Sequence, residues 1–222
     1  MNLLTPPSSL FDKFTTGDII LVHGRYFFSQ VIELVVGSIW SHSAVVIRKS
    51  DIDWDKHPIA TPPSEMPDLL LWESNTLTNL VDYVTGTHKE GPMLVDLKER
   101  MRTSFQDFPD VLVAHRSLHT QWQPAMLEAF LPFAAKVSPA TFPGDLKMGI
   151  MLFEGRFLNR QSDENEFFCS ELVAGTYINT GILTTKYPYN HYDPKDFSDA
   201  GSVDLLNGSW LGRQTIFNKM PD

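Results

Sequence analysis

Short apolar runs, separated by turn residues, predict a sheet in the first half of the chain. Each run holds four or five residues, is rich in β-branched and aliphatic side chains, and is too short for a buried helix. The predicted strands cover residues 19–22, 43–47, 69–72 and 111–114. Between the second and third of them, residues 50–68 carry four prolines and are expected to form an exposed excursion.

In two early segments the apolar residues fall at helical spacing. One covers residues 27–36 and is followed by Gly37, where a C-terminal cap would lie. The other is short, over residues 97–104, and Asp96 with Glu99 has the spacing of an N-terminal cap. Both segments are predicted helices.

Two further helices are predicted in the second half of the chain. Apolar residues over 122–137 have an amphipathic spacing, and Pro132 is expected to kink or end that helix. The last helix begins at Cys169 and ends near Gly181, after a polar loop over residues 159–166. Cys169 is therefore expected in the first turn of a helix.

Composition places the chain among ordinary globular proteins. Of its 222 residues, 42% are hydrophobic and 20% are charged, which excludes a disordered, collagenous or coiled-coil protein. No internal repeat divides the sequence. A single domain over residues 1–222, with its core at about residues 16–197, is the simplest interpretation.

Charge and cysteine content limit the partners and the compartment. Eighteen basic against 27 acidic residues give a net charge of −9, which disfavours nucleic acid and anionic lipid as partners. One cysteine excludes an intramolecular disulfide and any CxxC-type zinc or redox site. The N-terminus has no signal-peptide pattern, and no stretch is long enough to span a membrane. We expect a cytoplasmic protein, since a free thiol favours a reducing compartment.

Three residues are candidates for nucleophilic catalysis. The positive end of a helix dipole favours a thiolate, so Cys169 is a candidate nucleophile. His42 directly precedes a predicted strand and is the best-placed general base, and Glu73 ends another strand and is the candidate acid that orients it. The alternatives are a buried, inert cysteine, a loop histidine and a solvated carboxylate. His23 and His115, at strand ends, are candidates for a supporting role.

Five segments in this order resemble the circularly permuted NlpC-like papain-fold family, in particular its YiiX-like branch. They are GDIILV (17–22), SHSAVVI (41–47), WES (72–74), FFCSELV (167–173) and YDPKDF (192–197). In that family the catalytic histidine and acid precede the cysteine. The resemblance implies Cys169 as nucleophile, His42 as general base and Glu73 as orienting acid, with the Cys169 backbone N–H as one oxyanion donor. No second donor can be assigned.

The resemblance also implies the fold and narrows the branch of the family. It implies an α+β domain in which an antiparallel sheet of about five strands packs against the Cys169 helix. Members related to lecithin:retinol acyltransferase have Asn-Cys-Glu-His-Phe at the cysteine and use two histidines, whereas Cys169 lies between Phe168 and Ser170. Secreted cell-wall peptidases of this fold carry a signal sequence. Because the sequence shows no such pattern, peptidoglycan is not the expected substrate.

The expected activity is that of a thiol-dependent hydrolase acting on an amide, ester or thioester through an acyl-enzyme. The alternatives are a lipid acyltransferase or phospholipase-like variant, and an inactive module that binds a peptide or lipid. Trp40 and Tyr177 are candidates for lining an apolar substrate pocket, although the same positions suit a core. No metal or cofactor is expected. The expected partner is a peptide or acyl-lipid substrate, and the sequence gives no indication of oligomeric state.

Overall fold

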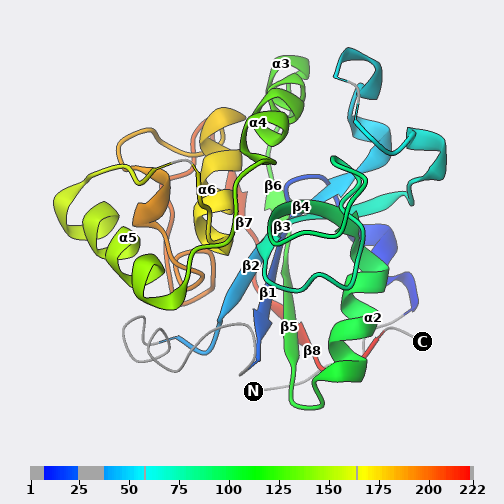
Figure 1. Ribbon diagram of the computed structural model, residues 1–222, viewed down its shortest axis with the longest axis horizontal. Coiled ribbons are helices and arrows are strands. Elements are labelled where there is room, and N and C mark those ends of the chain that lie inside the picture. Colours follow the sequence, from blue (N-terminus) through cyan, green and yellow to red (C-terminus); the bar gives the residue numbers. More distant parts are fainter. Residues whose placement is uncertain (1–7, 25–37, 58, 164, 221–222) are drawn as a thin grey trace.

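A mixed α/β fold is built on an antiparallel sheet, which has six strands within the described residues (Figure 1). The computed structural model describes residues 8–24, 38–57, 59–163 and 165–220. The helix predicted over residues 27–36 lies outside them. The strand order is β4-β3-β2-β1-β5-β8. The strands are β1 (Ile19–His23), β2 (His42–Arg48), β3 (Leu69–Asn75), β4 (Gly91–Asp96), β5 (Leu112–Arg116) and β8 (Thr215–Phe217).

The four predicted strands are confirmed, and the sheet gains two that the sequence did not indicate. Strand β4 contains Pro92, which argues against a central strand, but β4 lies at the edge of the sheet, where proline is tolerated. Strand β8 has three residues, too few for an alternating pattern. A separate two-stranded ribbon joins β6 (Leu118–His119) to β7 (Trp210–Leu211).

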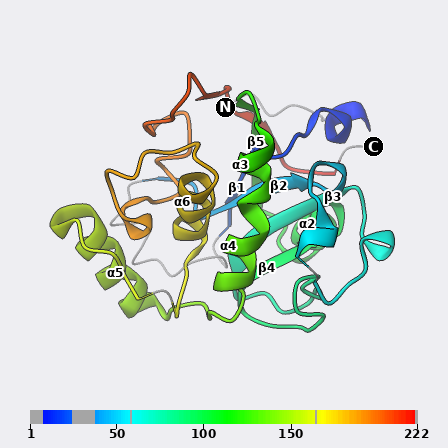
Figure 2. The same cartoon turned by 90° about the horizontal axis from the view of Figure 1, so that it is seen from above.

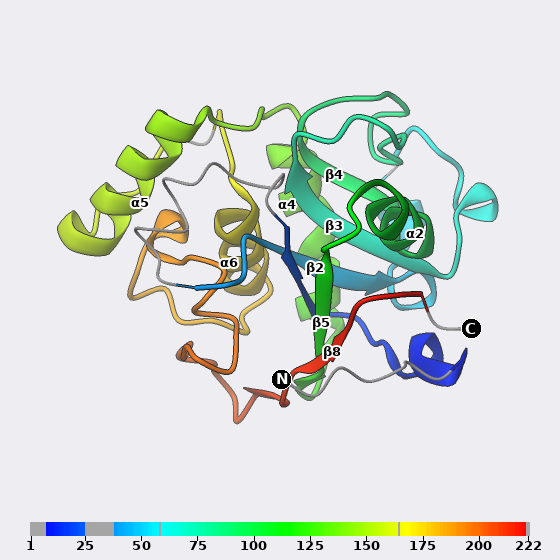
Figure 3. The same cartoon turned by 90° about the horizontal axis from the view of Figure 1, so that it is seen from below.

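Alternating side chains along the strands form two apolar clusters, one on each face of the sheet. Ile19 and Leu21 belong to the first cluster, together with α4 (Phe130–Val137) and α6 (Cys169–Asn179). Ile20 and Val22 belong to the second, with α2 (Leu97–Asp107) and the 3-10 helix η1 (Ser8–Lys13). Seen from above and from below, α4 and α2 lie on opposite faces of the sheet (Figures 2 and 3).

The helix over residues 97–104 is confirmed as α2, and its cap is the predicted one. The Asp96 carboxylate accepts a hydrogen bond from the Glu99 backbone N–H at 3.0 Å. The pattern over residues 122–137 instead gives two helices, α3 (Pro124–Glu128) and α4, which meet at Ala129. The interruption comes ahead of Pro132, because this residue then lies in the first turn of α4, where its missing N–H costs no helical hydrogen bond.

The helix predicted from Cys169 is confirmed as α6. Cys169 is its first residue, and Gly181 follows its C-terminal cap with a φ of +76°, a left-handed conformation that favours glycine. Phe167 and Phe168 are buried at the end of the loop that precedes α6.

The excursion over residues 50–68 is less exposed than its prolines suggested. Ile52, Trp54 and Met66 are buried and join the cluster that packs α4 and α6. Its 3-10 turns are η2 (Lys49–Asp51), η3 (Trp54–Lys56) and η4 (Pro63–Glu65). The apolar side chains before and among the prolines therefore anchor this segment to the body of the protein.

Helix α5 (Asp145–Leu158) was not predicted, because its apolar residues lie on two opposite faces and give no single-face pattern. Its inner face packs on the 3-10 turn η5 (Tyr189–His191), where the Asn190 side chain donates hydrogen bonds to the backbone of α5 and of Arg160. The Asn190 side chain is thus buried between α5 and the start of the loop that follows it. No helix in the described residues is both long and apolar enough to cross a membrane.

Gly155→Ala is expected to lower the free energy of unfolding by about 1–3 kcal/mol, since a Cβ at this glycine would lie 2.5 Å from the Asn190 carbonyl carbon. Urea denaturation would measure the change. Gly149→Ala is the matched control in the same helix: its Cβ would meet nothing within 4 Å, so that a gain of up to about 1 kcal/mol in helix propensity is expected. Equal effects of the two substitutions would contradict this packing.

Candidate active site

The structure brings Cys169, His42 and Glu73 together as one hydrogen-bonded chain. His42 Nε2 donates to Glu73 Oε2 at 2.9 Å, and the His42 side chain is also hydrogen-bonded to Cys169. Because Nε2 faces Glu73, Nδ1 is the ring nitrogen that meets the sulfur. The three residues come from the start of β2, from β3 and from the first turn of α6.

Strand pairing explains how the acid reaches the histidine. Strands β2 and β3 pair antiparallel with Val45 opposite Trp72, and the same register places Ala44 opposite Glu73. His42 is two residues from Ala44. His42 and Glu73 therefore project from the same face of the sheet and are offset by two residues along the paired strands. Local strand geometry therefore sets the orientation of the imidazole.

The segment Trp72-Glu73-Ser74 also fixes the cysteine helix. On the opposite face from Glu73, Trp72 Nε1 donates to Thr176 Oγ1 at 3.0 Å. Ser74 Oγ donates to the Phe167 carbonyl at 2.5 Å, two residues before Cys169. Three consecutive residues of β3 thus hold His42 on one face of the sheet and the helix that begins at Cys169 on the other.

Both oxygens of the Glu73 carboxylate are engaged. Oε1 accepts from Arg100 Nε at 2.6 Å, and Oε2 accepts from Asn75 Nδ2 at 3.1 Å in addition to His42. Arg100 is held in turn by Asn79 Oδ1 at 2.5 Å. Glu73 and Arg100 are at most 3% exposed, so that the low-dielectric surroundings strengthen the interaction between their charges.

These contacts set the charge states of the pair. Burial alone would lower the pKa of His42, but the hydrogen bonds and charges of Cys169 and Glu73 outweigh it and raise that pKa to about 9. Burial alone would raise the pKa of Glu73, but the Arg100 charge and the hydrogen bonds from His42 and Asn75 lower it to about 2. Near neutral pH the site therefore holds a carboxylate and an imidazolium, and the imidazolium is hydrogen-bonded to the Cys169 side chain.

The start of α6 presents the sulfur at a helix N-terminus. The Phe168 N–H donates to Glu171 Oε2 at 3.4 Å, so that Glu171 caps the helix from within its first turn. The backbone N–H groups of a first turn have no acceptor inside their own helix, and they are available to stabilise negative charge. Cys169 has no exposed surface, and His42 is 2% exposed.

Trp40 and Tyr177 are both buried in the apolar cluster that packs α4 and α6. Tyr177 lies eight residues beyond Cys169, about 12 Å along the helix axis. Its hydroxyl donates to the Gly17 carbonyl at 2.5 Å. The structure thus gives Tyr177 a supporting contact to the turn before β1, and a role of either residue in substrate binding stays a prediction.

Of the two supporting histidines, His115 belongs to a separate buried pair. His115 Nε2 lies 2.6 Å from Asp18 Oδ2, and Asp18 also accepts from the backbone N–H groups of Thr15 and Leu118. This pair joins β5 to the turn before β1 and shares no residue with the triad. His23 Nδ1 is 2.5 Å from the Ile39 carbonyl.

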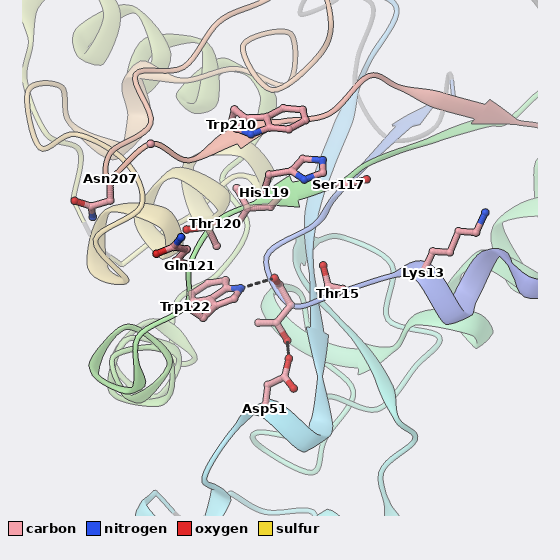
Figure 4. A pocket seen from close by; sticks show the side chains of 13 residues that line it. Lys13, Thr15, Asp51, Ser117, His119, Thr120, Gln121, Trp122, Asn207 and Trp210 are labelled. Atoms are coloured by element: carbon pink, nitrogen blue, oxygen red, sulfur yellow. Dashed lines mark hydrogen bonds between the residues drawn. The ribbon is translucent and has the colours of Figure 1, made fainter.

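A hollow of about 890 Å³ lies beside the turn that precedes β1 and beside the β6–β7 ribbon (Figure 4). Trp210 stacks on His119 with ring centroids 3.7 Å apart, and Trp122 Nε1 donates to the Thr16 carbonyl at 3.2 Å. Thr16 Oγ1 donates to Asp51 at 2.6 Å. No member of the triad lines this hollow, so that it is distinct from the candidate active site.

Arg100, Asn75 and Ser74 complete the site and were not singled out in the sequence. Arg100 lies on the inward face of α2 with Leu97, Met101 and Ser104. A charged residue on such a face needs a buried partner of opposite charge. An arginine at an apolar position of a predicted helix was therefore the feature of the sequence that could have indicated Arg100. Asn75 follows Glu73 by two residues in a strand and so shares its face.

Comparison of the sequence with models of protein families gave no match, and comparison with curated proteins gave none either. Within the described residues, no group of three or more histidine, cysteine or acidic side chains is arranged to hold a metal ion.

Proposed function

We propose that the protein is a papain-like cysteine hydrolase of the permuted NlpC-like type, which cleaves an amide, ester or thioester bond through an acyl-enzyme. The observation that carries this proposal is the buried chain from Cys169 through His42 to Glu73. A structural cysteine needs no imidazolium beside it, and a structural histidine needs no carboxylate fixed by an arginine.

Each residue then has a defined step. The Cys169 thiolate attacks the acyl carbon, and the Cys169 backbone N–H stabilises the resulting oxyanion. The His42 imidazolium gives its proton to the leaving amine, alcohol or thiol as the bond between that group and the acyl carbon breaks, which leaves the acyl group on the Cys169 sulfur. Neutral His42 then takes a proton from water, whose oxygen attacks the thioester and releases the acid. Glu73 keeps the ring oriented and stabilises its charged form.

Access to the sulfur is part of the proposal. Because Cys169 has no exposed surface, a substrate reaches it in a conformation that uncovers the first turn of α6. Small acyl donors are therefore the first reagents to use.

Incubation with p-nitrophenyl acetate, rapid acid quenching and intact-mass measurement should detect one acetyl group per chain on Cys169. A wild-type chain that gains no more acetyl than Cys169→Ala would refute the acyl-enzyme.

The rate of acylation by an alkyl ester or an amide, whose leaving group departs only with a proton, is expected to fall as the pH rises through about 9. His42 is protonated below its pKa of about 9, so that the proton for the leaving group is present below this pH and is lost above it. Glu73→Gln removes a charge and weakens a hydrogen bond that both raise this pKa, so that the fall should begin at lower pH. The exposed Glu99→Gln is the control and should leave the profile unchanged. A profile that Glu73→Gln does not move would contradict the assigned role.

A further inference from the structure

Helix α5 carries an apolar ridge on its outer side. Four of the ridge side chains are spaced by four, three and four residues, which places them on one helix face. The ridge consists of Leu146, Ile150, Phe153, Phe157 and the adjacent Leu158, each between 52 and 82% exposed. The rings of Phe153 and Phe157 pack against each other with centroids 5.1 Å apart.

The same helix is apolar on its inner side, and that side already has its partner. Met148, Met151 and Leu152 pack on Phe168, the residue before Cys169. A helix with two apolar faces is typical of a segment that is covered on both sides. In Figures 1 and 2, α5 lies at the edge of the molecule, and its outer side faces no other labelled element.

We propose that the α5 ridge docks on an uncharged lipid surface, with its aromatic and aliphatic side chains inserted among the acyl chains. The proposal depends on α5 alone and holds whether or not Cys169 is a nucleophile. Fourteen residues are too few for a helix to span a bilayer, so that α5 would lie along the surface.

The size and shape of the ridge favour lipid over a protein partner. At about 200 Å² for a fully exposed large side chain, the five residues present on the order of 600 Å². This is at the top of the range for the largest patch of a monomeric protein, and it falls short of the roughly 800 Å² per partner of a stable interface. A protein partner would also have to supply a groove for this ridge, whereas acyl chains adapt to its shape.

The charges beside the ridge indicate which lipid. Lys147 lies 2.5 Å from Glu166, Arg156 lies 3.1 Å from Asp196, and Arg160 lies 3.7 Å from Glu154. The cations that flank the ridge are therefore neutralised, and the whole chain carries a net charge of −9. Attraction to anionic headgroups is not expected, so that zwitterionic lipid should suffice.

Flotation of the full chain with vesicles of phosphatidylcholine tests the proposal. The wild type should float with these vesicles, and adding phosphatidylserine should not increase the bound fraction. Phe153→Ser combined with Phe157→Ser should weaken binding at least about tenfold, because two large apolar side chains no longer enter the lipid. Leu206→Ser combined with Trp210→Ser is the control, since it removes exposed apolar side chains outside α5 and should bind like the wild type.

Several results would overturn the lipid assignment. They are a wild type that stays unbound, binding that requires phosphatidylserine, and equal binding by the Phe153/Phe157 variant when its thermal unfolding matches the wild type. A wild-type dimer in sedimentation that this variant converts to monomer would assign the ridge to a second copy of the chain. The Phe157→Trp variant adds an independent signal: phosphatidylcholine vesicles should shift its fluorescence to shorter wavelength by more than that of the wild type.

Discussion

Replacing Glu73 with alanine is expected to lower the free energy of unfolding by about 3–5 kcal/mol. The carboxylate is the shared partner of Arg100 and His42, and all three side chains are at most 3% exposed. Its removal would leave a buried guanidinium and a buried imidazole without their counter-charge. Urea denaturation near neutral pH would measure the loss, since Glu73 is ionised well above its pKa of about 2.

The matched control for this prediction is Glu99→Ala. It removes the solvent-exposed partner of Arg102 in α2, the helix that also carries Arg100. An exposed ion pair contributes little, so that no clear loss of stability is expected. A second variant, Glu73→Leu with Arg100→Met, removes both buried charges and should recover much of the loss. If Glu73→Ala lowered the free energy of unfolding no more than Glu99→Ala, the buried charges of Glu73, Arg100 and His42 would not stabilise the fold as proposed.

The largest effect on activity is expected from replacing the proposed nucleophile, Cys169, and the proposed base, His42. Against p-nitrophenyl acetate, Cys169→Ala should lower the rate of catalysed hydrolysis by at least about 10³-fold and His42→Ala by about 10²–10⁴-fold. The two residues act in one step, so that the double variant should be little slower than Cys169→Ala. Steady-state release of p-nitrophenol measures all three rates.

His119→Ala is the control for this activity, because His119 is exposed on β6 and lies outside the triad. Its rate should equal that of the wild type. Wild-type hydrolysis no faster than that of Cys169→Ala would contradict the proposed function, and a double variant that loses the product of the two single effects would contradict a shared step.

The elements that the sequence revealed are those with one dominant period. Continuous apolar runs gave β1, β2, β3 and β5, and the cap at Asp96 gave α2. The missed elements lack such a pattern: β4 carries a proline, β8 is very short, and α5 is apolar on two faces. Tertiary contacts, which no local pattern records, determine these three.

For the site, the sequence located its three central residues but not their support. Position alone placed Cys169 at a helix start and His42 at the start of a strand, as the structure has them. Glu73 was expected at a strand end, whereas β3 continues to Asn75 and buries Glu73 within the strand. Arg100 was not found because its role depends on how α2 lies against β3. The register of β2 against β3, which brings Glu73 to His42, likewise follows from pairing between segments that are distant in the sequence.

The rate of alkylation by iodoacetamide near neutral pH tests the central claim most directly. The chain has one cysteine, so that intact mass reports on Cys169 without ambiguity. Cys169 is expected to react faster in the wild type than in His42→Ala, because His42 is hydrogen-bonded to the sulfur and can take up its proton. Equal rates in the two proteins would contradict the assignment of Cys169 and His42 as a catalytic pair.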